Sequence, residues 1–215
     1  MQDLPFRDRI HAGQVLSKEL KAYAGRPEVM VLALPRGGVP VAREVARVLH
    51  VPLDVFLVRK LGTPGQEELA MGAIASGGIR VLNEEVVRSL RVSQRSIDSV
   101  TARELRELAR REHMYREGRP PLDVTSNTVI LVDDGLATGS TMRAAVAALR
   151  EAKPKRIVVA VPVAAAPTCM DLREEVDDLI CLRTPEPFYS VGFWYEDFSQ
   201  TSDEEIREML EFEKV

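Results

Sequence analysis

The sequence predicts an α/β fold, with a parallel central sheet and helices on both of its faces. Apolar runs of strand length alternate along the chain with amphipathic segments of helical length, as in parallel strands joined by crossover helices. Two runs, 29–34 and 129–132, are hydrophobic without interruption, as expected for strands buried on both faces. A loop that contains glycine follows each run. In such sheets binding sites lie at the carboxyl ends of the strands.

The expected elements alternate in chain order. Strands are expected at 28–35, 52–60, 127–134, 155–164 and 177–183. Helices are expected at 7–24, 39–50, 93–118, 142–152, 168–176 and 202–213. Two β-capable segments flank Gly77–Gly78, which predicts a hairpin over 70–83. The apolar stripe of the long helix consists of Ile97, Val100, Leu105 and Leu108. The last helix begins with a capping box formed by Ser202 and Glu205.

Composition and charge limit the class of protein. The 215 residues suit one domain with a sizeable core, so 1–215 is expected to be a single unit. No apolar run approaches the ~20 residues of a membrane span, and the start MQDLPFRDRI has no signal-peptide pattern. A cytoplasmic protein without membrane contact is expected. Cys169 and Cys181 are expected to be buried free thiols, because they form no metal-ligand spacing and a disulfide framework would need more cysteines.

The charges are distributed unevenly along the chain. Residues 171–215 carry 14 acidic and 4 basic side chains, whereas the rest carries 19 acidic and 25 basic. A mildly cationic body suits an anionic small ligand, but it falls far short of the basic surface that binds nucleic acid. A nucleic-acid partner is therefore not expected.

The segment VILVDDGLATGST, residues 129–141, has the features of a phosphate-binding loop between a strand and a helix. Gly135 and Gly139 allow a tight turn and a close approach of the backbone to a ligand. The helix that follows directs its free N–H groups and the positive end of its dipole at the loop. Hydroxyl groups are supplied by Thr138, Ser140 and Thr141.

Two adjacent carboxylates, Asp133 and Asp134, end the apolar run of this segment. Ionised carboxylates only accept hydrogen bonds, so they pair well with neighbouring hydroxyls such as those of a ribose ring. The segment therefore predicts a joint site for a sugar diol and its phosphate. The chain has no G-x-x-x-x-G-K-[ST] motif and no G-x-G-x-x-G motif after a strand, which argues against nucleoside triphosphate and dinucleotide sites.

All thirteen positions of 129–141 resemble the signature of the type I phosphoribosyltransferases. The resemblance implies transfer of ribose 5-phosphate from phosphoribosyl pyrophosphate to a nucleobase-like acceptor, with release of pyrophosphate. It also implies Mg²⁺ as cofactor. If protein side chains hold the ion, Asp133 and Asp134 are the candidates. The resemblance further implies a homodimer. The loop Gly135–Thr141, which includes Ala137, corresponds to the family's 5-phosphate loop.

Further regions follow the plan of that family. LPRGG places Arg36, Gly37 and Gly38 in the pyrophosphate loop, where the resemblance implies a cis peptide between Pro35 and Arg36. The strand end VRK resembles that of the adenine-type enzymes and implies that Lys60 reaches pyrophosphate. The segment 60–73 lies where family members carry a mobile flap. The flap and hairpin are expected within 59–95, and the helix over 93–119 is an insertion or a dimer surface.

The acceptor end is expected in a hood within 184–215, which also contains the C-terminal helix. The tail PEPFYSVGFWYEDF loosely resembles the hood strand of hypoxanthine-type enzymes, so the candidates for stacking on a base are Phe188, Trp194 and Tyr195. Enzymes for 6-oxopurines carry an acid where this chain has Ala137, which disfavours hypoxanthine and guanine. The loop is closer to the adenine and uracil types, and the acceptor stays open.

The resemblance implies displacement at the anomeric carbon through an oxocarbenium-like state. Asp133 and Asp134 would hold the ribose, while Arg36, Lys60 and Mg²⁺ would offset charge on the departing pyrophosphate. The alternative is a regulatory protein on the same fold that senses phosphoribosyl pyrophosphate or a nucleotide without catalysis. The chain lacks room for an added DNA-binding domain, and glutamates are interspersed among the arginines of 93–119. These observations favour the enzyme.

Overall fold

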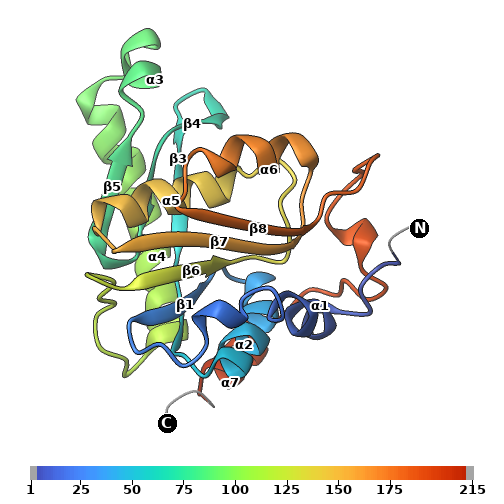
Figure 1. Cartoon of the computed structure of the whole chain (residues 1–215). Helices are drawn as coiled ribbons and strands as arrows, with labels where there is room; N and C mark the ends of the chain where they lie inside the picture. Colours follow the sequence, from blue (N-terminus) through green and yellow to red (C-terminus); the bar gives the residue numbers. More distant parts are fainter. Residues whose placement is uncertain (1–3, 212–215) are drawn as a thin grey trace.

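The computed structural model describes residues 4–211 and has a five-stranded parallel sheet at its centre (Figure 1). Its strands are β1 (Val29–Ala33), β2 (Leu53–Val55), β6 (Thr128–Val132), β7 (Arg156–Val163) and β8 (Asp178–Arg183). They lie side by side in the order β2-β1-β6-β7-β8, and every neighbouring pair is parallel. The predicted α/β class is confirmed.

Alternate residues of the strands supply two separate hydrophobic cores. Val29 and Val31 of β1 pack on one face, whereas Leu32 packs on the other. In β6, Ile130 belongs to the first core and Leu131 to the second. Because both faces are buried, the strands show continuous apolar sequence rather than alternation.

Helices cover both faces of this sheet (Figure 1). The first core contains residues of α1 (Arg9–Leu16), α2 (Gly38–Leu49), α4 (Gln94–Arg116) and α7 (Asp203–Glu211). The second contains residues of α5 (Ser140–Glu151) and α6 (Ala166–Arg173). Short 3₁₀ helices are formed by Lys21–Tyr23, Ser76–Gly78 and Gly192–Trp194. No helix within residues 4–211 combines the length and apolarity that crossing a bilayer would require.

A second sheet of three antiparallel strands lies beside the first. It consists of β3 (Val58–Thr63), β4 (Gln66–Ala75) and β5 (Ile79–Leu82), and the predicted hairpin at Gly77–Gly78 joins β4 to β5. The expectation of one strand over 52–60 is wrong. The chain leaves the parallel sheet after Val55, so Lys60 lies in the antiparallel sheet instead of at a core strand end. The segment 60–73, expected to be a flap, forms most of the β3–β4 hairpin.

Several predicted helices are shorter or placed differently. The expected helix over 7–24 ends as α1 at Leu16 and is followed by the 3₁₀ turn. Leu105 of α4 is 39% exposed, so it does not belong to the buried stripe that contains Ile97 and Leu108. In its place Thr101 and Glu104 face inward, and Glu104 binds Arg59 of β3 at 2.7 Å. A short helix, α3 (Glu84–Ser89), precedes α4.

The C-terminal helix α7 packs against α2 and α4. Its capping box is confirmed, because the Ser202 N–H donates to Glu205 Oε2 at 2.7 Å and the Glu205 N–H donates to Ser202 Oγ at 3.2 Å. The predicted end of this helix at 213 lies outside the described residues.

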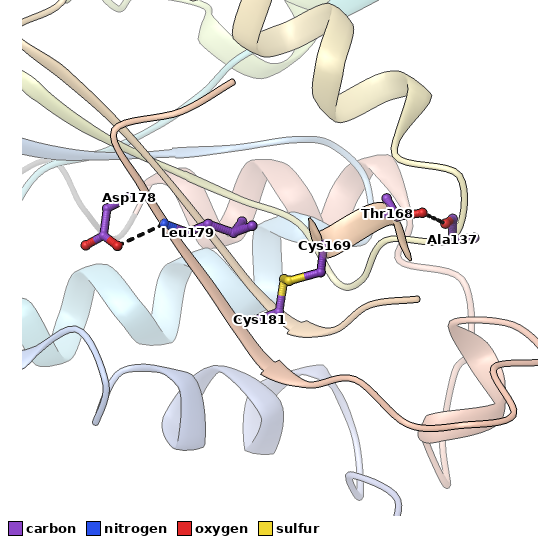
Figure 2. Close-up of a disulfide and its surroundings, with 6 residues drawn as sticks. All are labelled: Ala137, Thr168, Cys169, Asp178, Leu179 and Cys181. Carbon is purple, nitrogen blue, oxygen red and sulfur yellow. Dashed lines mark hydrogen bonds between the residues drawn. A yellow bond between two sulfur atoms is a disulfide. The ribbon is translucent and has the colours of Figure 1, made fainter. Parts of the chain in front are cut away.

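The cysteines form a disulfide between α6 and β8, so the expectation of free thiols is wrong (Figure 2). The short α6 connects β7 to β8 and folds back onto β8, which brings Cys169 to Cys181 across 12 positions of sequence. Spacing alone could not show this, since it does not tell which face of each element the thiols occupy. The crosslink fixes the helix that carries Thr168.

We expect reduction of this disulfide to lower the free energy of unfolding by about 3 kcal/mol, because the crosslink closes a short loop in the unfolded chain. Urea denaturation with and without dithiothreitol measures the difference. The control is the double variant Cys169→Ala, Cys181→Ala, in which the reductant should change nothing. An unchanged midpoint for the natural chain would mean that the two thiols are not joined in solution.

Candidate active site

The candidate site lies where the neighbouring strands β1 and β6 end. Ala33 is aligned with Val132, and the Leu34 N–H donates to the Val132 carbonyl at 2.9 Å. The two loops that follow these strands therefore lie side by side. One is LPRGG and the other begins with the acid pair Asp133 and Asp134. The structure thus brings together the two motifs that the sequence singled out separately.

The glycines of the first loop allow it to pack directly on the acids. A Cβ atom on Gly37 would lie 1.9 Å from Asp134 Oδ2. On Gly38 it would lie 2.7 Å from the Val132 carbonyl oxygen and 3.0 Å from Asp133 Cα. Neither position has room for a side chain. The peptide between Pro35 and Arg36 is cis, as the sequence resemblance implies.

Burial dominates the electrostatics of the acid pair. It raises the pKa of Asp133 well above its usual value, and the carboxylate of Asp134 adds to this increase. Burial also raises the pKa of Asp134, although a hydrogen bond from Arg9 opposes the increase. The Asp134 N–H donates to Asp133 Oδ1 at 2.8 Å. A ligand that brings hydroxyl donors or positive charge would therefore stabilise both carboxylates.

The loop after the acids ends at the first turn of α5. Gly139 has a φ of +68°, a left-handed conformation that favours glycine, and it directly precedes Ser140 at the start of the helix. The exposed Thr138 and Ser140 lie together, with their hydroxyl oxygens 3.4 Å apart. Thr168 of α6 supports the loop, since its hydroxyl donates to the Ala137 carbonyl at 2.6 Å (Figure 2). The remaining loop residue, Thr141, lies within the first turn of α5.

Lys60 reaches this loop from the antiparallel sheet. Its Nζ atom lies 3.5 Å from Ser140 Oγ. Both residues border an open groove of about 880 Å³ between β4, β5 and α5, whose walls are largely apolar and include Leu69 and Ala147. The structure therefore places Lys60 beside the predicted 5-phosphate loop.

Arg36 borders a second hollow of about 420 Å³. This hollow lies between the LPRGG loop and the segment that precedes α7. It is lined by Arg9, Arg36, Gly37, Asp134, Phe198, Gln200 and Thr201. Within residues 4–211 the Arg36 side chain makes no hydrogen bond and no ion pair, so its fork of donors is available to an anion.

The aromatic residues of the tail form a small cluster with the N-terminal segment. Tyr195 is buried, and its hydroxyl donates to the Asp134 carbonyl at 2.6 Å, so it holds the backbone of the acid pair in place. Phe188 and Trp194 are half-buried and pack against this cluster. The more open aromatic ring at the hollow belongs to Phe198, which is 38% exposed.

Comparisons with known proteins agree with this arrangement. The sequence profile of the family described as "Phosphoribosyl transferase domain" matches residues 8–189. A Mycobacterium tuberculosis protein named "Putative phosphoribosyl transferase Rv0571c" is 44% identical over 206 residues, which are 96% of this chain and 46% of that protein. The chain thus spans about half the length of this relative. The chain belongs to the phosphoribosyl transferase domain family.

Two further relatives extend the comparison. The crystal structure of TT1426 from Thermus thermophilus is 42% identical and superimposes with a TM-score of 0.87, covering 96% of this chain and 98% of that one. The protein named "Bifunctional protein PyrR" from Corynebacterium efficiens is 31% identical over 131 residues, which are 57% of this chain and 66% of that protein. The fold and family expected from the sequence are confirmed.

Three residues near the site were not expected from the sequence. Arg9 is one of many arginines in the chain, and nothing in its local pattern shows that it meets Asp134. Phe198 is the last residue of the tail segment that resembles a hood strand, but the resemblance does not single it out. Thr168 lies on a helix 31 positions along the chain from Ala137. Each reaches the site through a tertiary contact between residues that are 31 or more positions apart in the sequence.

Proposed function

We propose that the chain transfers ribose 5-phosphate from phosphoribosyl pyrophosphate to a nucleobase-like acceptor and releases pyrophosphate. The observation that carries the proposal is the meeting of the two loops at the ends of β1 and β6. The acid pair is followed in the chain by the loop that leads into α5, and Asp134 lines the same hollow as Arg36. This arrangement supports a phosphate at the start of α5 and a second anionic group at Arg36. A phosphoribosyl pyrophosphate molecule presents a sugar diol, a 5-phosphate and a pyrophosphate, so each part of the site has a matching group.

The residues divide into three roles. Asp133 and Asp134 accept hydrogen bonds from the ribose hydroxyls, and their negative charge favours the positive charge that develops on the ring. The cradle from Gly135 to Thr141 anchors the 5-phosphate, and this remote binding orients the anomeric carbon. Arg36, with Gly37 and Gly38 beside it, faces the departing pyrophosphate.

The acid pair also fits Mg²⁺, which binds through one or two carboxylates together with phosphate and water oxygens. When bound, Mg²⁺ neutralises charge on the pyrophosphate. Among residues 4–211 no group of three or more acidic, histidine or cysteine side chains is arranged so that it could hold a metal ion by itself. Most of the oxygen ligands would therefore come from the substrate and water.

Lys60 takes a different role from the one that the resemblance implies. Its Nζ atom lies beside Ser140, and Ser140 begins the helix whose free N–H groups face the cradle. We therefore assign Lys60 to the 5-phosphate and leave Arg36 as the cation of the pyrophosphate loop. The two cations then bind opposite ends of the same substrate.

Aromatic rings lie on the side where the acceptor is expected, and the loop 135–141 has no acidic residue after the acid pair. Ala137 occupies the position where 6-oxopurine enzymes carry an acid, and its carbonyl is used by Thr168. Phe198 offers a partly exposed ring, and Phe188 and Trp194 stay candidates for stacking on a base. These features support a nucleobase-like acceptor other than hypoxanthine or guanine. We also propose that the enzyme is homodimeric, which is what the family resemblance implies, and cytoplasmic.

The direct test incubates the protein with labelled phosphoribosyl pyrophosphate, Mg²⁺ and a panel of nitrogen heterocycles, and follows release of pyrophosphate. Pyrophosphate release that depends on one acceptor supports the proposal. Tight binding of phosphoribosyl pyrophosphate without turnover on any acceptor would favour the sensing alternative. Failure to bind it at all would remove both.

We expect Asp133→Asn to weaken binding of phosphoribosyl pyrophosphate by roughly 1.5–3 kcal/mol, the contribution of a hydrogen bond to a charged group. Calorimetry in the presence of Mg²⁺ measures the change. Asp171→Asn is the matched control, because Asp171 is an exposed acid of α6 that pairs with Arg143. Equal affinities for the natural chain and Asp133→Asn would remove Asp133 from the ribose site.

A further inference from the structure

Arg9 is the residue of α1 that contacts the acid pair. Its Nε donates to Asp134 Oδ2 at 2.8 Å, and only 11% of the Arg9 side chain and 14% of the Asp134 side chain are exposed. A second donor, Nη1, binds the Ser199 carbonyl at 2.7 Å. The guanidinium also lies over the Phe198 ring, 4.0 Å from its centre. Arg9 is therefore held by three partners from two distant parts of the chain.

These contacts leave the two oxygens of Asp134 in different surroundings. Oδ2 accepts from Arg9 and is the atom that a side chain on Gly37 would meet. Among the residues that the structure describes, no other residue donates a hydrogen bond to Oδ1, and Asp134 borders the 420 Å³ hollow. An ionised carboxylate can accept about four hydrogen bonds. Asp134 thus has one oxygen engaged and one available to a ligand.

The backbone of Asp134 is fixed as well. The Tyr195 hydroxyl donates to its carbonyl oxygen, and the Tyr195 ring contacts the Phe198 ring with centres 5.2 Å apart. Phe198 in turn supports Arg9. Asp134, Arg9, Phe198 and Tyr195 form a closed set of contacts, which Arg9 joins at the Asp134 carboxylate and Tyr195 joins at the Asp134 carbonyl.

We propose that Arg9 is a positioning residue for phosphoribosyl transfer, which holds the Asp134 carboxylate so that its Oδ1 faces a ribose hydroxyl. Without Arg9, Asp134 would lie beside Asp133 with no cation to oppose their repulsion, and its carboxylate would be free to rotate. Binding of the sugar would then require the carboxylate to be ordered. Arg9 does this before the substrate arrives, which is the usual benefit of a supporting group behind a binding residue. This inference rests on the proposed function, because it assumes that Asp134 binds ribose.

The test compares two probes, ribose 5-phosphate and inorganic phosphate, by calorimetry. Both can enter the phosphate cradle, but only the first carries the sugar hydroxyls. We expect Arg9→Gln to lower the affinity for ribose 5-phosphate about tenfold, which is the loss of one hydrogen bond to a charged group. The affinity for inorganic phosphate should stay unchanged. Asp134→Asn should give the same pattern. The double variant should lose no more than Asp134→Asn alone, because Arg9 acts through that carboxylate.

Two further variants separate positioning from general stability. Arg9→Lys keeps a cation but not the planar fork that reaches Asp134 and Ser199 together, so its affinity for ribose 5-phosphate should lie between those of the natural chain and Arg9→Gln. Arg7→Gln, at an exposed position two residues away, should behave as the natural chain. A variant of Arg9 that weakens both probes equally would show a merely structural role and would overturn the inference.

The outcomes also distinguish this inference from the proposed function. If the natural chain binds ribose 5-phosphate no better than inorganic phosphate, the sugar site itself is wrong, and the inference falls with it. If Asp134→Asn loses the preference for ribose 5-phosphate and Arg9→Gln keeps it, the sugar site stands and the role of Arg9 is refuted.

Discussion

Gly139→Val is expected to abolish binding of both ribose 5-phosphate and phosphoribosyl pyrophosphate. Gly139 has a φ of +68°, which a β-branched residue adopts only with strain of order 1–3 kcal/mol. A Cβ atom there would also lie 2.7 Å from the methyl carbon of Thr168. The first turn of α5 would have to shift, and its N–H groups would no longer face a phosphate. Calorimetry with each ligand measures the loss.

The control for this variant uses the contact with Thr168. Thr168→Ser removes the methyl group but keeps the hydroxyl that binds the Ala137 carbonyl. Gly139→Ala should therefore bind better in the Thr168→Ser background than alone, since only the strain of φ remains. Circular dichroism checks that each variant is folded. A folded Gly139→Val that still binds ribose 5-phosphate would show that this loop is not the phosphate cradle.

Arg36→Ala and Lys60→Ala are expected to affect different ligands. Arg36→Ala should weaken phosphoribosyl pyrophosphate about 10–100-fold, the worth of charge-assisted bonds to phosphate oxygens, and leave ribose 5-phosphate nearly unchanged. Lys60→Ala should weaken both ligands by a similar factor, because both carry the 5-phosphate beside Ser140. The contrast follows from the different surroundings of the two cations, because Lys60 lies beside Ser140 and Arg36 borders the hollow lined by Asp134.

Calorimetry with both ligands against both variants gives four affinities that decide the assignment. Lys18→Ala, at an exposed position after α1, serves as the control. If Lys60→Ala weakens binding of phosphoribosyl pyrophosphate only, Lys60 reaches pyrophosphate, as the family resemblance implies. Our assignment of Lys60 to the 5-phosphate would then be wrong. Equal losses of both ligands in Arg36→Ala would place Arg36 at the 5-phosphate or in the fold.

The parallel sheet could be predicted because its strands are buried on both faces, which gives continuous apolar runs such as 129–132. The division between the two sheets could not. The chain stays apolar where it leaves β2, because Phe56 and Leu57, which lie between β2 and β3 in the sequence, are buried. Local hydrophobicity does not distinguish one long strand from two short strands in different sheets. The position of Lys60 in the antiparallel sheet could therefore not be predicted from the sequence either.

The acid pair and the glycines around it could be predicted because their chemistry lies in contiguous motifs. The partners of those motifs could not, since Arg9 and Phe198 meet only after folding. The disulfide shows the same limit. Two cysteines 12 positions apart carry no sign of pairing until α6 folds back on β8. Contiguous residues reveal the groups that bind a ligand, whereas the groups that hold them in place come from distant segments.

The contact between the two ends of the chain has a consequence for the order of folding. Phe6 and Tyr195 form an isolated bridge, and Arg9 binds the Ser199 carbonyl across 190 positions of sequence. Closing so long a loop costs entropy that the bridge alone cannot repay, so these contacts form only when the parallel sheet already holds both ends near each other. We expect the contacts between residues 6–9 and residues 195–199 to form last during folding and to open first in native-state fluctuations. The same opening would release Asp134 from Arg9, so the order in which the chain assembles would also determine when the carboxylate that we propose binds the sugar is held in place.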